Sequence, residues 1–177
     1  LLIDSKVAEI VSGLKQRGIR VKYDHADNTR PGWKFAEYEM KGVPLRIAIG
    51  ARDIENNVVE LARRDTREKN TVALDGLENL ILEQLEDIQQ CIFNKAKVYR
   101  DEHITKVNTW EEFKEVLDKK GGFVSAHWDG SSETEEKIKT ESKATIRCIP
   151  LDNLQEEGIC VYSGNPSKER VLFARAY

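Results

Sequence analysis

The sequence has few cysteines and no long apolar run, and each shortage excludes a class of protein. Three cysteines, an odd number with no short repeated spacing, argue against a disulfide framework and for a reducing compartment such as the cytoplasm. No apolar stretch approaches the roughly 20 residues that span a bilayer, so no membrane partner is expected. The composition, 40% hydrophobic and 33% charged over 177 residues, is typical of a soluble globular chain.

An excess of positive charge is also absent. Lys and Arg total 28 against 31 Asp and Glu, which gives a net charge of −3. A chain of this balance does not bind nucleic acid through bulk electrostatics, so any RNA contact must come from a local patch. The sequence starts at Leu1, with neither a methionine nor the basic start and cleavage site of a signal peptide. We therefore expect a piece of a longer chain.

Motifs for self-contained catalysis are missing as well. The sequence has no Gly-rich phosphate loop, no Gly-x-Ser-x-Gly elbow and no His-Glu-x-x-His, and its three histidines are scattered. Structural zinc needs four thiolate or imidazole ligands, usually in close pairs, and no such pair is formed by Cys91, Cys148 and Cys160. The sequence alone therefore predicts no catalytic residue and no metal site in this piece.

Hydrophobic spacing predicts a first domain of mixed helices and strands. Apolar residues recur at helical intervals over 4–17 and 33–41, and one long apolar stripe runs from Leu77 to Tyr99. Period-two alternation predicts four strands between these helices, at 19–24, 45–49, 58–62 and 71–74.

A second, smaller α+β domain is predicted after residue 104. The pattern turns polar over 100–107, and we place the boundary there, dividing 1–104 from 105–177. Thr109 with Glu112 is a capping-box signature that opens a helix through about residue 119. A charged helix is predicted at 133–141, and strands are predicted at 123–128, 144–149, 159–162 and 171–176.

Two groups of charged side chains in the first domain suit RNA recognition. We expect carboxylates and guanidinium groups to converge at the rim of one sheet. These groups belong to Glu39, Arg46, Arg52 and Asp53. Such pairs read guanine or cytosine edges by bidentate hydrogen bonds. The hairpin between 58–62 and 71–74 adds further cations, Arg63, Arg64, Arg67 and Lys69. For the hairpin alone, RNA binding and a merely solvated turn both stay open.

Three aromatic residues precede this group. Trp33, Phe35 and Tyr38 have the faces on which unstacked bases lie. Their helical spacing favours packing in the core over base stacking.

Several motifs, in order, resemble a known family. The first half resembles the anticodon-binding domain of prolyl-tRNA synthetases of the eukaryote-like and archaeal-like type, on the motifs at 31–35, 39–46, 50–53 and 64–69. The second half is similar to the extra C-terminal domain of that type, on Ala144–Pro150, Gly164–Ser167 and Phe173–Tyr177. The resemblance covers essentially the whole chain. It implies an α/β fold with a mixed sheet flanked by helices, and with one further strand before Leu1.

The resemblance also implies a function. Family members join proline to its tRNA at the expense of ATP, with Mg²⁺, in a catalytic domain that would precede Leu1. This piece is then itself inactive, and its partners are proline tRNA, the catalytic domain and, in the full-length enzyme, a second copy. The positions that match the family's readers of the two anticodon guanines are Glu39, Arg46, Arg52, Asp53 and Lys69. The carboxylate of Tyr177 would face the catalytic domain.

Zinc is not expected, although the resemblance raises it. Family members often hold zinc in the C-terminal domain with four cysteines, and the matching positions here are Trp128, Glu133, Cys160 and Ser163. One thiolate cannot build a tetrahedral site. We expect Trp128 to fill this space by packing.

A second interpretation stays open. A module of the same fold that docks on a protein, or pairs with a second copy, and never touches tRNA would show the same motifs, because a shared fold does not guarantee a shared function. The long apolar stripe of 77–99 would suit such a contact.

Overall fold

The computed structural model describes residues 2–26, 28–151, 153 and 155–176. Its internal contacts divide the chain into two compact units, Leu1–Lys95 and Ala96–Tyr177. Each unit has a sheet and a hydrophobic core of its own, and helices and strands mix in both. The α/β class predicted from the sequence is confirmed. Within the described ranges, no helix is long and apolar enough to cross a membrane.

The first unit opens with the helix α1 (Leu2–Gln16), on which Val7 and Leu14 are buried. Gly18 follows the helix with φ +78°, a backbone conformation that residues with a Cβ rarely adopt. This turn lets the Ile19 amide donate to the Leu14 carbonyl at 3.1 Å. A bond of that kind closes the C-terminal end of a helix, as the sequence predicts for Gly18.

Three antiparallel strands form the sheet of the first unit, in the order β1-β2-β3. They are β1 (Leu45–Ala48), β2 (Val58–Arg63) and β3 (Lys69–Ala73). Side chains alternate along a strand, so one face carries the buried Val59 and Leu61 of β2. The opposite face carries the residues between them. The pairing predicted for 58–62 with 71–74 is confirmed.

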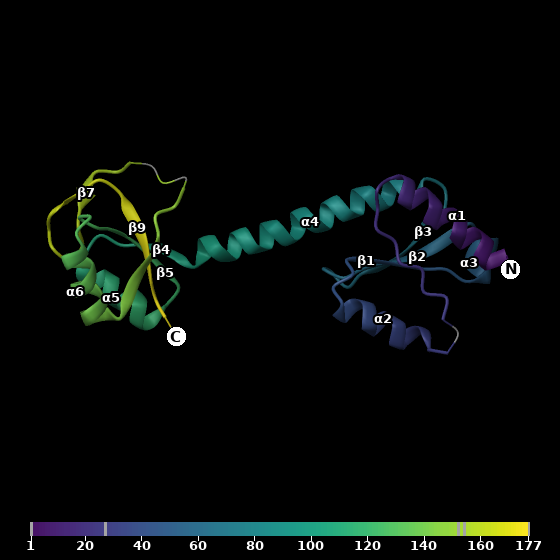
Figure 1. Cartoon of the computed structure of the whole chain (residues 1–177), viewed down its shortest axis with the longest axis horizontal. Helices are drawn as coiled ribbons and strands as arrows, with labels where there is room; N and C mark the ends of the chain where they lie inside the picture. Colours follow the sequence, from purple (N-terminus) through teal and green to yellow (C-terminus); the bar gives the residue numbers. More distant parts are fainter. Residues whose placement is uncertain (1, 27, 152, 154, 177) are drawn as a thin grey trace. The chain divides into compact units, whose positions relative to one another are not determined.

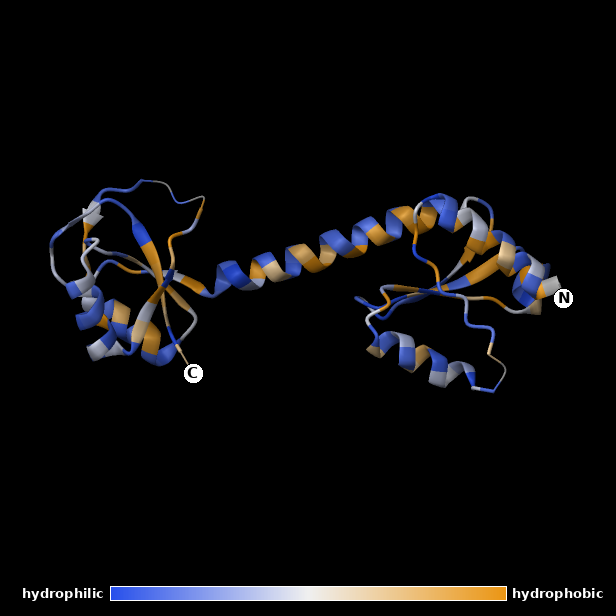
Figure 2. Cartoon of the chain, in the orientation of Figure 1, coloured by the Kyte–Doolittle hydropathy of each residue, from blue (hydrophilic) through white to orange (hydrophobic). Residues whose placement is uncertain are grey.

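Helices lie on both faces of this sheet. The face of Val59 and Leu61 packs against α1 and the first turns of α4 (Leu77–Glu102), whose Leu77 and Ile81 are buried there. Figure 2 shows the hydrophobic residues gathered on this side. The helix α2 (Pro31–Met40) lies on the opposite face (Figure 1). Every residue of α2 keeps some exposure to solvent, so the core is one-sided.

The strand predicted at 19–24 is wrong, and the first unit has three strands among its described residues instead of four. Ile19 and Val21 do pack half-buried against the core, as their alternation predicts. A strand also needs backbone partners, and in the described part of the chain no strand pairs with this segment. The alternation over 19–24 therefore predicts the burial of this segment correctly and its strand pairing incorrectly.

Arg63, the last residue of β2, fastens the β2–β3 hairpin. Its guanidinium donates two bonds to the Asp65 carboxylate, at 3.1 and 2.9 Å. It also donates to Gln84 and Asp87 of α4. The Arg63 and Asp65 side chains are only 12% and 4% exposed. This arginine therefore holds the hairpin against α4 and is not available to a ligand.

The second unit is built on a four-stranded sheet in the order β4-β5-β9-β6. Its strands are β4 (Ile104–Lys106), β5 (Phe123–His127), β6 (Ala144–Cys148) and β9 (Arg170–Arg175). Only the β4–β5 pair is parallel among the described pairings. The strand β4 lies in a stretch predicted as a polar linker, because three residues are too few to show a period.

The remaining elements of the second unit are mostly as predicted. The helix α5 (Trp110–Lys119) begins with the capping box of Thr109 and Glu112, and α6 (Ser132–Ser142) is the charged helix. The strand predicted at 159–162 shrinks to β7 (Gly158–Ile159), which pairs with β8 (Pro166–Ser167) away from the main sheet. The core is centred on Phe113, Val124, Ile138 and Phe173, all fully buried.

We expect Arg63→Ala to lower the free energy of unfolding by about 2–4 kcal/mol, because it leaves the buried Asp65 carboxylate without its partner. Urea unfolding followed by circular dichroism measures the change. Arg67→Ala, on the same hairpin and exposed, is the matched control and should change stability by less than about 0.5 kcal/mol. Equal losses in the two variants would contradict the role given to Arg63.

Candidate nucleic-acid interface

Arg46 and Lys69 lie in one row across the sheet of the first unit. The register pairs Arg46 of β1 with Ala62 of β2, and Ala62 with Lys69 of β3. Directly opposed residues share a face, so the side chains of Arg46 and Lys69 point to the same side, away from the core. Lys69 is exposed and lies on an edge strand. The sheet therefore brings together two of the predicted RNA-binding residues.

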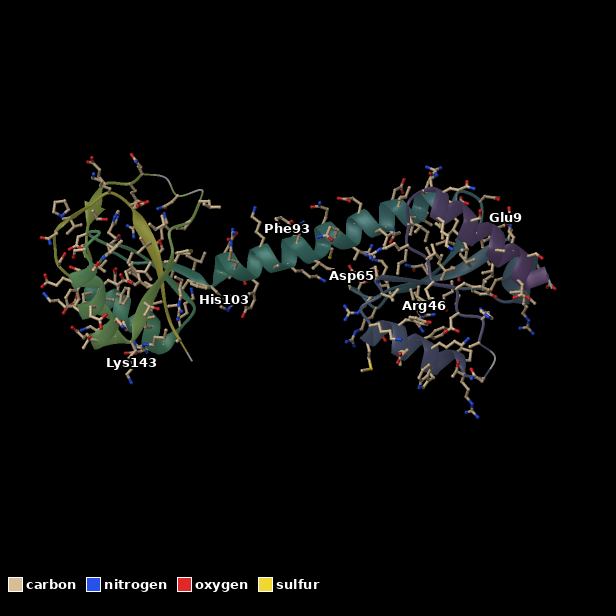
Figure 3. All side chains as sticks on the ribbon, viewed as in Figure 1. Glu9, Arg46, Asp65, Phe93, His103 and Lys143 are labelled. Atoms are coloured by element: carbon tan, nitrogen blue, oxygen red, sulfur yellow. The ribbon has the colours of Figure 1, made fainter. Side chains whose placement is uncertain are left out.

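The guanidinium of Arg46 is held between a ring and a carboxylate. Its central carbon lies 3.5 Å from the centroid of the Phe35 ring of α2. One of its terminal nitrogens lies 3.4 Å from Glu60 Oε1 on β2. The Arg46 side chain is 18% exposed, and Figure 3 shows it between the sheet and α2. Stacking and ion pairing together fix the plane in which its donors lie.

Phe35 and Glu60 are the positioning residues that sequence reasoning missed. Phe35 was interpreted as core, yet it is half-buried and packs on Arg46. Glu60 was not singled out at all. Because Ala48 pairs with Glu60 and Arg46 with Ala62, Glu60 is a diagonal neighbour of Arg46 on the same face. A register assigned to the predicted strands would have found it.

Arg52 and Asp53 lie on α3 (Ala51–Glu55), a short helix that follows β1 and that was not predicted from the sequence. The Asp53 carboxylate accepts a hydrogen bond from the Gly50 amide at 2.7 Å, so it caps the start of its own helix. Arg52 is exposed, and it has no ion-pair partner among the described residues. These two residues are therefore attached to a helix beyond the end of β1, not to the sheet itself.

Glu39 lies near the C-terminal end of α2, with an exposed side chain. Its backbone carbonyl accepts a hydrogen bond from Arg64 Nε at 2.8 Å, which joins α2 to the hairpin. The five predicted residues thus come from α2, the sheet and α3, all in the first unit. Their contacts with RNA stay a prediction.

The aromatic residues of α2 differ from one another. Trp33 is 57% exposed, so the core packing favoured for it is wrong. Tyr38 is half-buried and donates its hydroxyl proton to Asp24 at 3.0 Å. Lys34 also pairs with this carboxylate, and its hydrogen bond is the main reason why the pKa of Asp24 falls to about 2. Helical spacing gave the same prediction for all three rings because it does not show which helix face meets the sheet.

In the second unit, the side chains at the four positions that match the family's zinc ligands make other contacts or lie buried. The Trp128 indole donates to the Ser131 carbonyl, and Glu133 pairs with Lys137 at 2.6 Å. Cys160 is buried and, like the other two cysteines, free. No cluster of three or more His, Cys, Asp or Glu side chains that could hold a metal occurs in the described ranges.

Tyr177 lies outside the described residues.

The Asp129 carboxylate occupies the centre of this region. It accepts hydrogen bonds from the side chains of Ser131, Thr134, Ser163 and Asn165, at 2.7–3.2 Å. Partial burial opposes ionisation, but these bonds and one from the Ser131 amide outweigh it and hold the pKa of Asp129 well below its usual range. The network joins the start of α6 to the loop around residue 164.

Two protein-family models match the chain. Residues 3–84 match a family described as anticodon binding domain, and residues 110–177 match one described as prolyl-tRNA synthetase, C-terminal. Over 99% of the chain, a proline–tRNA ligase of Porphyromonas gingivalis is 59% identical and one of Bacteroides fragilis is 57% identical. One of Flavobacterium johnsoniae is 55% identical over the same share. The chain spans 35–36% of the length of these relatives.

Asp129→Asn should destabilise the second unit by roughly 1–3 kcal/mol near neutral pH, because the charged acceptor of several hydrogen bonds is lost. The folded-state pKa is depressed, so the stabilisation is complete above the unfolded value of about 4 and is lost as pH falls below it. The difference between wild type and variant should therefore shrink in acid.

Urea unfolding followed by tryptophan fluorescence measures this difference at several pH values. Glu157→Gln neutralises an exposed carboxylate in the same unit and is the matched control. A difference that is constant from pH 7 down to pH 3 would contradict the assignment to Asp129.

Proposed function

This chain belongs to the prolyl-tRNA synthetase family, of which it carries the anticodon-binding and C-terminal domains, and we propose that its first unit reads the anticodon of proline tRNA. The observation that carries the proposal is the guanidinium of Arg46, fixed by Phe35 and Glu60 on the sheet face away from the core, with 18% of its side chain still exposed. Lys69 extends the same row. Sequence-specific RNA recognition uses splayed bases, whose edges such rigid donors can reach.

The chemistry of guanine fits these side chains. Guanine presents the O6 and N7 acceptors on one edge and nitrogen-bound protons on another. Arg46, Arg52 and Lys69 supply donors for the first edge, and the exposed carboxylate of Glu39 accepts from the second. A guanidinium plane that is already fixed loses little conformational freedom when RNA arrives. One oxygen of the Asp53 carboxylate accepts from the Gly50 amide, and the other oxygen remains available as an acceptor.

The activity of the whole protein is part of the proposal. We propose that this chain works beside a catalytic domain that uses ATP and Mg²⁺ to join proline to its tRNA in the cytoplasm, and that the full-length enzyme forms a homodimer. The Tyr177 carboxylate then faces that domain. The extra C-terminal domain supports the eukaryote-like and archaeal-like subtype, and the relatives named above are bacterial proteins.

Arg52→Ala and Lys69→Ala should each weaken binding to proline tRNA by about 1–3 kcal/mol, because each removes a donor to a base edge. Filter binding with the wild type and both variants measures the loss. The variants should also discriminate less against a transcript in which the two anticodon guanines are replaced.

Lys15→Ala is the matched control, since Lys15 is exposed on α1 and α1 covers the opposite face of the sheet. It should leave affinity unchanged. A wild type that binds both transcripts equally would overturn anticodon recognition. Unchanged affinity in both variants would show that the wrong residues were chosen.

The second unit, we propose, folds without zinc. Its single thiol at the four family positions, Cys160, is buried, and the Asp129 hydrogen bonds join the segments that a metal would otherwise join. Elemental analysis of purified, tag-free protein should find well below one zinc per chain, and a chelator should leave the unfolding curve unchanged. Stoichiometric zinc would overturn this proposal.

A module that binds protein and not tRNA is the alternative. It is favoured by the exposed apolar side chains of α4, namely Ile92, Phe93, Val98 and Tyr99, of which Phe93 is labelled in Figure 3. A chain of this kind would show no preference for proline tRNA over an unrelated tRNA. Native gels with both RNAs separate the two functions.

A further inference from the structure

A depression of about 470 Å³ lies where α2, the hairpin and α4 meet in the first unit. Glu39, Gly42 and Pro44 line it from the α2 side. The hairpin contributes Arg64, Asp65 and Arg67, and α4 contributes Ile88, Ile92 and Lys95. Glu39 is also one of the predicted base readers, so the depression borders the surface that reads the anticodon under the proposed function.

The depression keeps an excess of positive charge once the ion pairs within the protein are taken into account. Asp65 is paired with Arg63, which keeps the pKa of Asp65 at about 2, so this carboxylate is already neutralised. Among the described residues, no carboxylate pairs with Arg64, Arg67 or Lys95. Three cations therefore face one exposed carboxylate, that of Glu39.

The surrounding fold holds Arg64, and the turn that carries Arg67, in place. The Arg64 amide donates to the Pro44 carbonyl at 3.0 Å, and Arg64 Nε donates to the Glu39 carbonyl. Both terminal nitrogens of Arg64 remain without a partner in the described part of the chain. Arg67 sits at the hairpin tip with φ +63°, in a turn that Arg63 fastens to α4. Ile88, which is buried, and the exposed Ile92 supply the apolar part of the lining.

We propose that Arg64, Arg67 and Lys95 bind the backbone phosphates of the RNA loop whose bases the neighbouring sheet face reads. The inference rests on the proposed function and extends it to a sequence-independent contact. Cations that neither a carboxylate nor a ring orients suit a phosphate chain better than a base, because phosphate oxygens accept hydrogen bonds from many directions, whereas a base edge needs donors fixed in one plane. Glu39 at the border keeps the phosphates out of the base-reading position by repulsion.

The test uses Arg67→Gln and Lys95→Gln in the full chain, with Lys15→Gln as the matched control. Lys95 lies on α4 and Arg67 lies on the hairpin, so a loss of affinity seen in both variants cannot come from local misfolding of the hairpin. Filter binding over a range of salt concentrations is measured with proline tRNA and with the transcript in which both anticodon guanines are replaced.

Each variant should lose about threefold to tenfold in affinity for both RNAs alike. The slope of log affinity against log salt should become shallower by about 0.7–0.9 for each contact removed. Unchanged affinity and slope in both variants would overturn the inference. So would a loss confined to proline tRNA, since it would indicate a base contact. Failure of the wild type to distinguish the two RNAs overturns the proposed function instead.

Discussion

The alternation of side chains along β2 is the constraint on which the first unit depends. Val59 and Leu61 must face α1 and α4, because these residues carry the core of the unit. Period two then sends Glu60 and Ala62 to the other face. The register across Ala62 brings Arg46 and Lys69 to that face as well. How the core is buried thus fixes which residues lie on the sheet face that we propose reads RNA.

The basic residues of the first unit fall into two groups that only the structure separates. Carboxylates hold both Arg63 and Arg46. Arg63 joins the hairpin to α4, whereas Arg46 is an oriented hydrogen-bond donor. Arg64 and Lys69 lack such partners in the described ranges. A net charge of −3 conceals this division, because the acidic residues neutralise some cations and leave others without an ion-pair partner in the described ranges.

Sequence reasoning succeeded where a pattern was long and local. The stripe beginning at Leu77 predicted α4, and Thr109 with Glu112 predicted the start of α5. It failed where the outcome depended on a distant partner. The segment 19–24 alternates but pairs with no strand in the described part of the chain, and Trp33 faces solvent because another side of α2 meets the sheet.

The candidate site was predictable only in part, because several of its contacts also depend on partners that are distant in the sequence. The motifs pointed to Arg46 and Lys69, and the structure supplied their common row. Phe35 and Glu60 were missed because their role exists only in contact with Arg46. Asp129 was missed because its partners are spread from Ser131 to Asn165, and no spacing rule links them.

The helix α4 runs unbroken through the point where the two units divide, between Lys95 and Ala96. Proteases need extended backbone, and a junction made of helix offers them none until it unwinds. Every residue from Ile92 to Arg100 is nevertheless exposed to solvent, so only hydrogen bonds within the helix protect it. The rate at which an enzyme such as trypsin separates the halves of this protein is therefore set by how often a few turns of one helix fray open.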